Sequence, residues 1–333
     1  MKVLVIGGSR FIGLHLVRLL HSQGHEVSVL NRGQTPADLP DGVTRMRADR
    51  TKPAQVRAVL KDEYDVAFDI SCYTTDGLQP VVDCLRGRVG HFIFCSTTSV
   101  YAPTDLAPIE EDFPLSRDEG AGDYARNKVR CEDMLMEESG KNGFPATVIR
   151  PPVVYGPDNY IPEREFSFFA RLQRQRPIIM PGDGNVFVHT VHVDDLAAAF
   201  VAAVGRKSTF GQAYTACGPH AIIGNGWVSV VGEAMGVVPE IVYVAPERYE
   251  AMHRELGIAE AYPFEWAQSR VYSNRKAGRE LGWSPGYQMA DGMAMTYEWW
   301  RRRGLYKVER DFSAEDRALE WLGCQSGKKP RDL

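Results

Sequence analysis

Tyr124 and Lys128 stand four residues apart, the spacing of neighbours on one face of a helix. A nearby ammonium favours the phenolate form of a tyrosine and so lowers the pKa of its hydroxyl toward neutral pH. Such a phenol can give and take a proton while an alcohol and a carbonyl interconvert. Because pairs with this spacing also arise by chance, the interpretation depends on the segments around them.

A glycine-rich turn lies between a strand-like apolar run at residues 2–6 and a helix-like stretch with leucines at helical spacing. Glycines in this position let the backbone approach a pyrophosphate, and the start of the helix offers unpaired N–H groups with a positive dipole end. The pattern predicts a dinucleotide site. Its expected contacts are Gly7, Gly8, Ser9, Arg10, Phe11, Ile12 and Gly13.

The end of the second predicted strand, residues 25–30, carries Asn31 and Arg32. An NAD site places Asp or Glu there to hold the ribose hydroxyls, whereas a guanidinium pairs with the 2′-phosphate of NADP. Arg10 is a second candidate for that phosphate. We therefore predict NADP ahead of NAD, with solvated surface arginines as the alternative.

Another buried strand, residues 91–95, runs into the hydroxyl residues Ser96, Thr97, Thr98 and Ser99. Doubly wound sheets carry their sites at the carboxyl ends of strands, so one of these hydroxyls is positioned to hydrogen-bond a reacting oxygen.

Strand-like and helix-like stretches alternate up to residue 150, which predicts an α/β Rossmann fold, a doubly wound parallel sheet with a smaller C-terminal α/β substrate lobe. Residues 1–155 form the expected NAD(P)-binding domain, with 186–205 returning to it. Residues 156–185 and 206–325 form the expected substrate lobe, and 326–333 a flexible tail. The predicted strands are 2–6, 25–30, 43–47, 66–70, 91–95 and 146–149, and the predicted helices are 53–61, 76–85 and 124–139.

The amino-acid composition excludes few classes of function. A formal net charge of -4 gives no overall footprint for nucleic acid or an anionic membrane, and no apolar run approaches the ~20 residues that span a bilayer. The first residues pass directly into a strand rather than an apolar signal segment, so we expect a cytoplasmic protein.

Taken together, these motifs resemble the extended short-chain dehydrogenase/reductase superfamily, specifically the NAD(P)-dependent sugar epimerase/dehydratase family. The resemblance assigns the catalytic roles to Thr97, Tyr124 and Lys128, with Asp76 where the family has a structural asparagine. It places the cofactor near Asp49, Ser71, Cys72, Ser96, Pro151 and Val153, as well as near Tyr124 and Lys128. It also places substrate contacts at Thr98, Tyr155, Arg164, Phe187, His189 and Arg270, for each of which ordinary packing is the competing interpretation.

Three departures, at Arg10, at Asn31-Arg32 and at Asp76, mark an atypical branch of the family. The turn at residues 7–13 followed by Asn31-Arg32-Gly33 is similar to the chloroplast stem-loop RNA-binding group and its bacterial relatives. That likeness leaves an RNA-binding or NADP-sensing protein as the alternative to an enzyme. The retained Thr97, Tyr124 and Lys128 favour an enzyme, and nucleic acid is the less favoured partner.

The family's 4,6-dehydratases carry an Asp-Glu pair after the catalytic hydroxyl, whereas this chain has Thr98-Ser99. This disfavours dehydration and leaves epimerisation or carbonyl reduction of a nucleotide-sugar or related small molecule. No metal is expected, since alternation along a strand places His189 and His192 on opposite faces. Relatives dimerise through the helices at 76–85 and 124–139, so a homodimer is expected.

Overall fold

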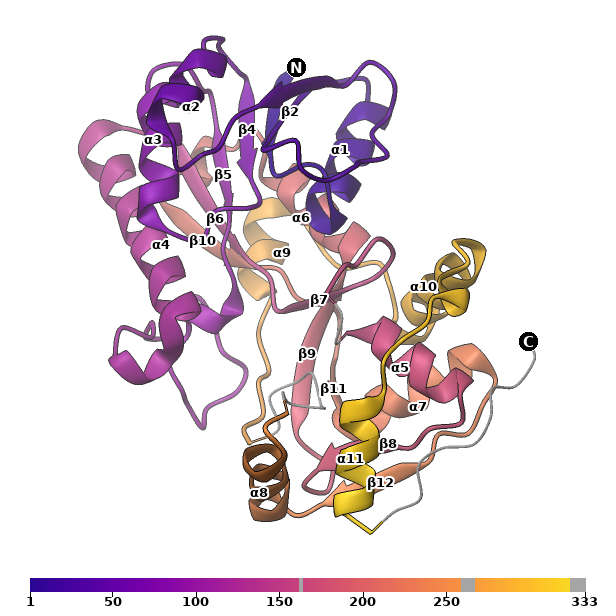
Figure 1. The fold of residues 1–333 in the computed structure, drawn as a ribbon. Coiled ribbons are helices and arrows are strands. Elements are labelled where there is room, and N and C mark those ends of the chain that lie inside the picture. The colour runs from indigo at the N-terminus through magenta and orange to yellow at the C-terminus, as the bar shows by residue number, and fades with distance from the viewer. Residues whose placement is uncertain (162–163, 259–266, 324–333) are drawn as a thin grey trace. The chain divides into compact units, whose positions relative to one another are not determined.

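Short buried strands alternate with helices along the first 150 residues of the computed structural model, which describes residues 1–161, 164–258 and 267–323 (Figure 1). Except for the edge strand β3 (Thr44–Arg47), which is mostly exposed, the strands are buried over nearly their whole length because helices cover both faces of the sheet. The bounds are β1 Lys2–Ile6, α1 Phe11–Ser22, β2 Glu26–Asn31, β3 Thr44–Arg47, α2 Pro53–Val59, β4 Val66–Asp69, α3 Thr75–Leu85, β5 Phe92–Cys95, α4 Gly122–Asn142 and β6 Ala146–Arg150.

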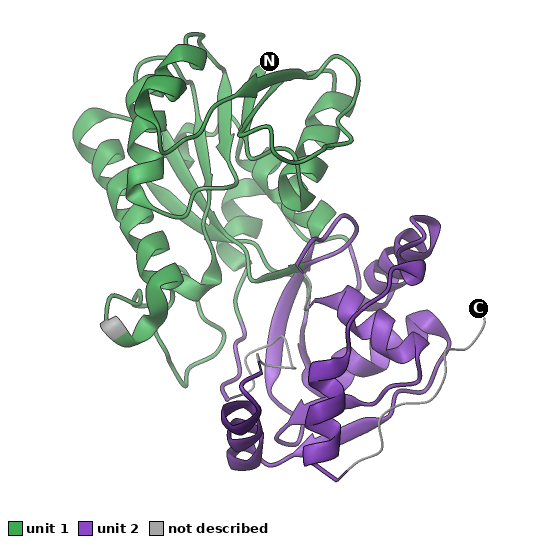
Figure 2. Ribbon diagram, in the orientation of Figure 1, with its two compact units in different colours: residues 1–154, 193–219, 272–286 green, residues 155–192, 220–271, 287–333 purple. Residues whose placement is uncertain are grey.

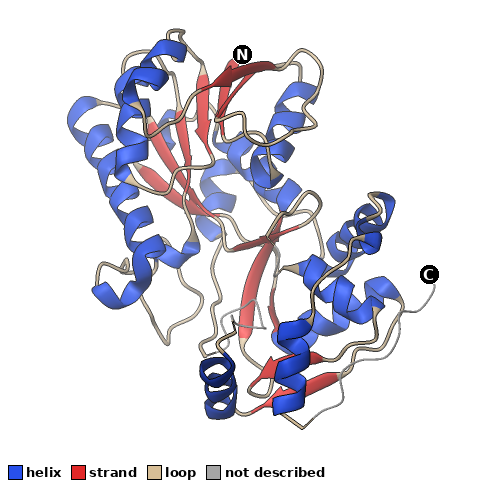
Figure 3. Cartoon of the chain, viewed as in Figure 1, coloured by secondary structure: helices blue, strands red, loops and turns tan. Residues whose placement is uncertain are grey.

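These strands form a parallel sheet with the order β10-β6-β5-β4-β1-β2-β3, in which β10 (Gln212–Thr215) pairs with β6. The strand order reverses between β1 and β4, and this switch point is where doubly wound sheets hold their ligands. Helices α2, α3 and α4 pack in sequence, and α1 packs against α6 (Val193–Ala203). Figure 3 shows these two groups on opposite faces of the sheet. The predicted α/β Rossmann fold is confirmed.

The chain divides into two units, residues 1–154, 193–219 and 272–286 in unit 1, and residues 155–192, 220–271 and 287–333 in unit 2 (Figure 2). The expected returning segment, 186–205, is split: β9 (Phe187–His192) lies in unit 2, and α6 lies in unit 1. Two elements that were expected in the substrate lobe, residues 206–325, belong to unit 1 instead: β10 and α9 (Arg275–Leu281). Pairing decides both differences, because β9 joins β11 (Ala221–Ile223) and β10 joins β6. The expected tail, 326–333, lies outside the described residues.

Unit 2 has a core of large aromatic side chains. Trp227, Phe168 and Phe169 are 1% exposed or less, and Phe169 meets the rings of Tyr297 and Trp300 at 5.2 and 5.6 Å between centroids. Its elements are α5 Glu165–Gln173, β8 Ile178–Pro181, β9, β11, α7 Gly224–Met235, β12 Ile241–Val244, α8 Pro246–Leu256, α10 Met289–Arg302 and α11 Ser313–Trp321. Among the described residues, no helix combines the length and the hydropathy needed to span a bilayer.

A buried histidine joins three elements of unit 1. His91, just before β5, faces the Thr147 hydroxyl with Nε2 at 2.8 Å, and the backbone N–H of Gly205 donates to Nδ1 at 3.2 Å. An Nδ1 that accepts must be unprotonated, so the neutral ring with its proton on Nε2 fits both contacts. Burial lowers the pKa of His91 to about 4.

Candidate active site

The glycine turn is closely packed against the rest of unit 1. Gly7 has a φ of +90°, and a Cβ on it would lie 2.6 Å from the Ser71 side chain. A Cβ on Gly13 would lie 2.2 Å from the Gly7 carbonyl oxygen, so α1 approaches the turn as closely as only glycine allows. Arg10, the residue before α1, is extended and makes no side-chain cap to the helix. The first-turn N–H groups therefore have no cap from Arg10, as a pyrophosphate cradle requires.

The end of β2 is organised by Asn31. Its Nδ2 donates to the Ser9 hydroxyl and its Oδ1 accepts from the Gly33 backbone N–H at 2.7 Å, so the amide ties the glycine turn to the next loop. Arg32 is exposed there. Arg47 at the end of β3 lies beside it, because its Nε donates to the Arg32 carbonyl oxygen at 3.0 Å. Arg47 was not among the predicted site residues, and its pairing with Asn31 across β2 and β3 could not be known from spacing alone.

A buried ion pair that the sequence did not reveal joins the β3–α2 loop to the end of β4. Arg50 binds Asp69 through two hydrogen bonds of 2.8 and 2.5 Å, and its Nε donates to the Gly77 carbonyl oxygen at 3.0 Å. Burial opposes the charge on Arg50, but the Asp69 carboxylate outweighs it and raises the pKa of the guanidinium. The neighbouring Asp49 accepts two hydrogen bonds from Thr51, which lower the pKa of its carboxyl. The pair thus ties the β3–α2 loop and the start of α3 to the end of β4, beside the switch point.

The β4–α3 loop follows directly. The Ser71 backbone N–H donates to Asp69, and Cys72 is fully buried, with its thiol on the Thr74 carbonyl oxygen at 3.2 Å. Thr74 caps α3 by accepting from the Gly77 backbone N–H at 3.4 Å. Asp76 lies exposed in the first turn of that helix, so the capping role belongs to Thr74.

The hydroxyl residues at the end of β5 are largely buried. The Thr97 hydroxyl accepts from the Ser99 backbone N–H at 3.2 Å, and the Thr98 backbone N–H donates to the Pro151 carbonyl oxygen at 2.9 Å. The second contact brings the segment of Pro151 and Val153 beside these hydroxyls. The Ser96 hydroxyl is buried without a hydrogen-bond partner among the described residues. An unsatisfied buried hydroxyl carries a free-energy penalty unless a ligand completes it, so this atom fits a bound cofactor.

Helix α4 carries both Tyr124 and Lys128, and Lys128 reaches the carboxyl end of β5. The Lys128 ammonium is 2% exposed and donates to the Cys95 carbonyl oxygen, at the end of β5, at 2.7 Å. Tyr124, one turn earlier, is 48% exposed. The helix is anchored by Glu132, which pairs with Arg150 at the end of β6 at 2.6 Å. The Lys128 ammonium therefore lies at the carboxyl end of β5, which Ser96 and Thr97 follow in the chain, and the Tyr124 side chain is half exposed.

The expected substrate contacts of unit 2 fall into different environments. Tyr155 is 2% exposed and packs against the rings of His192 and Trp227, which supports the packing interpretation for that residue. His189 is also buried. Phe187 is exposed, and its carbonyl oxygen accepts from the Arg270 backbone N–H at 2.9 Å, so these two residues are neighbours. Arg164, just before α5, is partly exposed.

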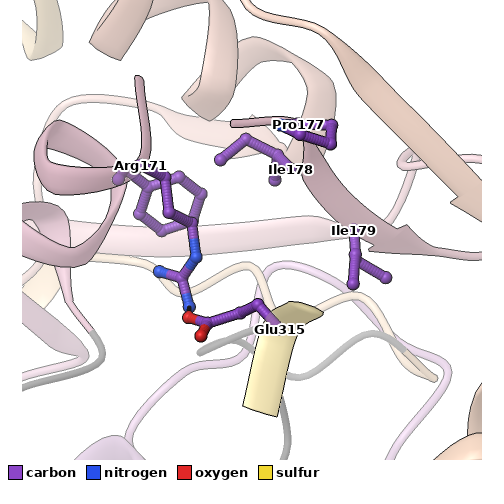
Figure 4. A pocket seen from close by; sticks show the side chains of 6 residues that line it. Arg171, Pro177, Ile178, Ile179 and Glu315 are labelled. Carbon is purple, nitrogen blue, oxygen red and sulfur yellow. Dashed lines mark hydrogen bonds and ion pairs between the residues drawn. The ribbon is translucent and has the colours of Figure 1, made fainter. Parts of the chain in front are cut away.

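The arginines in and just after α5, and those at 301–303, could serve an RNA-binding protein as a basic patch, but several of them make contacts within unit 2. Arg171 is buried and pairs with Glu315 at 2.7 Å in a small pocket of α5 and α11, also lined by Pro177, Ile178 and Ile179 (Figure 4). Arg176 pairs with Asp316, and the guanidinium of Arg174 lies over the Phe312 ring. In the run at 301–303, Arg302 pairs with Glu298 at 2.5 Å. These contacts oppose the idea of a free basic surface at these residues.

A doubly wound parallel sheet with a glycine turn after β1 defines a dinucleotide-binding protein of the Rossmann class. Residues 3–217 match the model of the NAD dependent epimerase/dehydratase family, and the chain belongs to that family. It is therefore an NAD(P)-dependent enzyme of the epimerase, dehydratase and reductase kind.

Two relatives span most of the chain. It is 32% identical to the chloroplast stem-loop binding protein of 41 kDa b of Arabidopsis thaliana, over 96% of this chain and 84% of the relative. It is 24% identical to 2'-dehydrokanamycin reductase of Streptomyces kanamyceticus, over 90% and 80%. Among solved structures, a UDP-glucose 4-epimerase superposes with a TM-score of 0.78 over 91% of this chain and 98% of that one, at 20% identity. The last comparison shows the shared fold.

Proposed function

We propose that this protein is an NAD(P)-dependent epimerase or reductase that acts on a nucleotide-sugar or related carbonyl or alcohol through Tyr124 and Lys128. The observation that carries the proposal is the position of the Lys128 ammonium. It is buried on the carbonyl oxygen of Cys95, the residue before the unsatisfied Ser96 hydroxyl, and lies one helical turn from an exposed phenol.

The nicotinamide cofactor supplies the hydride acceptor or donor when it is bound. The glycine turn and the first N–H groups of α1 would hold its pyrophosphate, and Ser96 would complete its own hydrogen bonding there. Arg32, helped by Arg10 and Arg47, would hold the 2′-phosphate of NADP, which we place ahead of NAD because Asn31 and Arg32 stand at the end of β2 where an NAD site has a carboxylate.

The chain's own residues handle the proton. Tyr124 takes the hydroxyl proton of an alcohol, or returns one to an alkoxide, at its phenol oxygen. Lys128 favours the charged phenol and would bind the cofactor ribose, and Thr97 orients the reacting oxygen by a hydrogen bond. Thr98 is buried and Ser99 is exposed, and neither is a carboxylate, so the site has no acid and base there for water elimination.

Two measurements test the proposal. Cofactor released from the purified protein and identified by mass separates the two reactions, because retained NAD+ favours an epimerase and an empty site that takes up NADPH favours a reductase. With a turnover assay in hand, Tyr124→Phe should abolish turnover and leave cofactor binding intact. Tyr243→Phe, which alters an equally exposed tyrosine on β12 of unit 2, is the control. Unchanged turnover in Tyr124→Phe would remove the phenol from the mechanism.

RNA binding is the second candidate, favoured by the name of the chloroplast relative. It predicts an affinity for a stem-loop RNA that falls steeply as salt rises, with no turnover of small molecules. The internal pairing of Arg171 and Arg176 makes it the weaker candidate.

A further inference from the structure

Tyr73 is an aromatic residue of the β4–α3 loop to which no role has yet been given. The residues around it are fixed: Asp69 is paired with Arg50, Cys72 is buried, and Thr74 caps α3. The side chain of Tyr73 is nevertheless 52% exposed. The neighbours that cover the other half of this side chain therefore indicate what the ring contributes.

The Tyr73 ring contacts both members of the proposed pair. The Lys128 ammonium lies 5.1 Å from its centroid, and the Tyr124 ring lies 6.1 Å away at an interplanar angle of 47°. On its other sides the ammonium meets the Phe94 ring at 4.9 Å and the Cys95 carbonyl oxygen. Within the described part of the chain, no carboxylate pairs with Lys128, so two aromatic rings and one carbonyl hold this buried cation.

Cation–π attraction operates within about 6 Å of a ring centroid and is strongest where water is excluded. An ammonium that is 2% exposed and lacks a carboxylate partner depends on such contacts to stay in place. The attraction comes from the face of the ring, so phenylalanine would supply it and leucine would not.

We propose that Tyr73 is a positioning residue for the Tyr124–Lys128 pair, and that its ring, rather than its hydroxyl, holds the Lys128 ammonium where the cofactor ribose is bound. This inference rests on the proposed function, because it assumes that Lys128 touches the cofactor. It assigns a role at the site to the β4–α3 loop, which the catalytic motifs do not include.

The test is the affinity for NADPH, measured by nicotinamide fluorescence without any substrate. Tyr73→Leu should weaken binding about three- to tenfold, the range that one cation–π contact contributes, whereas Tyr73→Phe should bind like the unaltered chain. In a Lys128→Met background, Tyr73→Leu should change the affinity by less than about twofold, since the group on which it acts is gone. Tyr243→Leu controls for the loss of an equally exposed tyrosine.

A weakening that persists in the Lys128→Met background, or that Tyr73→Phe shares, would overturn the proposal. Circular dichroism and thermal unfolding of each variant separate misfolding from loss of the contact. If Tyr73→Leu does not fold, comparison of Tyr73→Phe with Tyr73→Met replaces it, and equal affinities would then overturn the proposal. Failure of the proposed function gives a different result, because Tyr124→Phe would then leave turnover unchanged whatever NADPH affinities the Tyr73 variants show.

Discussion

Replacing Asp69 by asparagine should destabilise unit 1 far more than the same change in an exposed pair. Asp69 is fully buried and binds Arg50 through two hydrogen bonds, and the Arg50 side chain is 15% exposed. Asp69→Asn leaves a buried guanidinium without its countercharge. Breaking a buried pair from one side costs about 3–5 kcal/mol, and we expect about 3 because the amide oxygen still accepts one hydrogen bond.

Arg117 and Asp133 provide the matched control, since they also form two hydrogen bonds but are 59% and 45% exposed. Asp133→Asn should cost less than about 1 kcal/mol because solvent screens the pair. In thermal unfolding of a unit of about two hundred residues, the first change should lower Tm by roughly 6–12 °C and the second by less than about 4 °C. Equal losses in the two variants would refute the idea that burial makes the Arg50–Asp69 pair important.

Three further predictions follow from the structure. Gly13→Ala should abolish NADPH binding, because its Cβ would lie 2.2 Å from a backbone oxygen, whereas Gly140→Ala in α4 meets nothing within 4 Å and should bind normally. Arg32→Ala should weaken NADPH binding about tenfold and leave NADH binding unchanged, with Arg45→Ala as the control; a parallel loss for both cofactors would argue against a 2′-phosphate contact. Burial lowers the pKa of His91 from 6.5 in the unfolded chain to about 4 in the folded protein, so the folded state binds fewer protons between these values. The free energy of unfolding should therefore fall by about 3 kcal/mol as the pH drops from 6.5 toward 4. Urea unfolding of His91→Gln should show a smaller fall.

Local pattern was enough to place the elements of the main sheet. The runs at 2–6, 66–70 and 91–95 match β1, β4 and β5 to within one residue, because a buried parallel strand is a short apolar or β-branched run closed by a turn. Strand β10 could not be placed this way. Its sequence is ordinary, and it belongs to the sheet only because it pairs with β6, more than sixty residues earlier. The same non-local pairing decided the boundaries of the units.

The residues of the candidate site also fall into two groups, those that a local sequence motif predicts and those that only the fold brings together. The glycine turn, the hydroxyls after β5 and the Tyr124–Lys128 pair were predicted because each is a local motif. The Arg50–Asp69 pair and the contacts of Tyr73 join residues from different loops, and no spacing rule reaches them. Tyr155 shows the opposite case, since a position taken from a family resemblance proved to lie in the aromatic core of unit 2.

Strand β10 is synthesised long after its partner β6, and this delay has a consequence during translation. Strand β6 is complete at residue 150, but its outer edge stays bare until residues 212–215 have left the ribosome. At translation rates of about 5–20 residues per second, that wait lasts roughly 3–12 s. During this time a row of free backbone donors and acceptors can recruit a strand from another nascent chain. Fragments that stop before residue 212 should therefore aggregate, and attempts to express the nucleotide domain alone need to include β10.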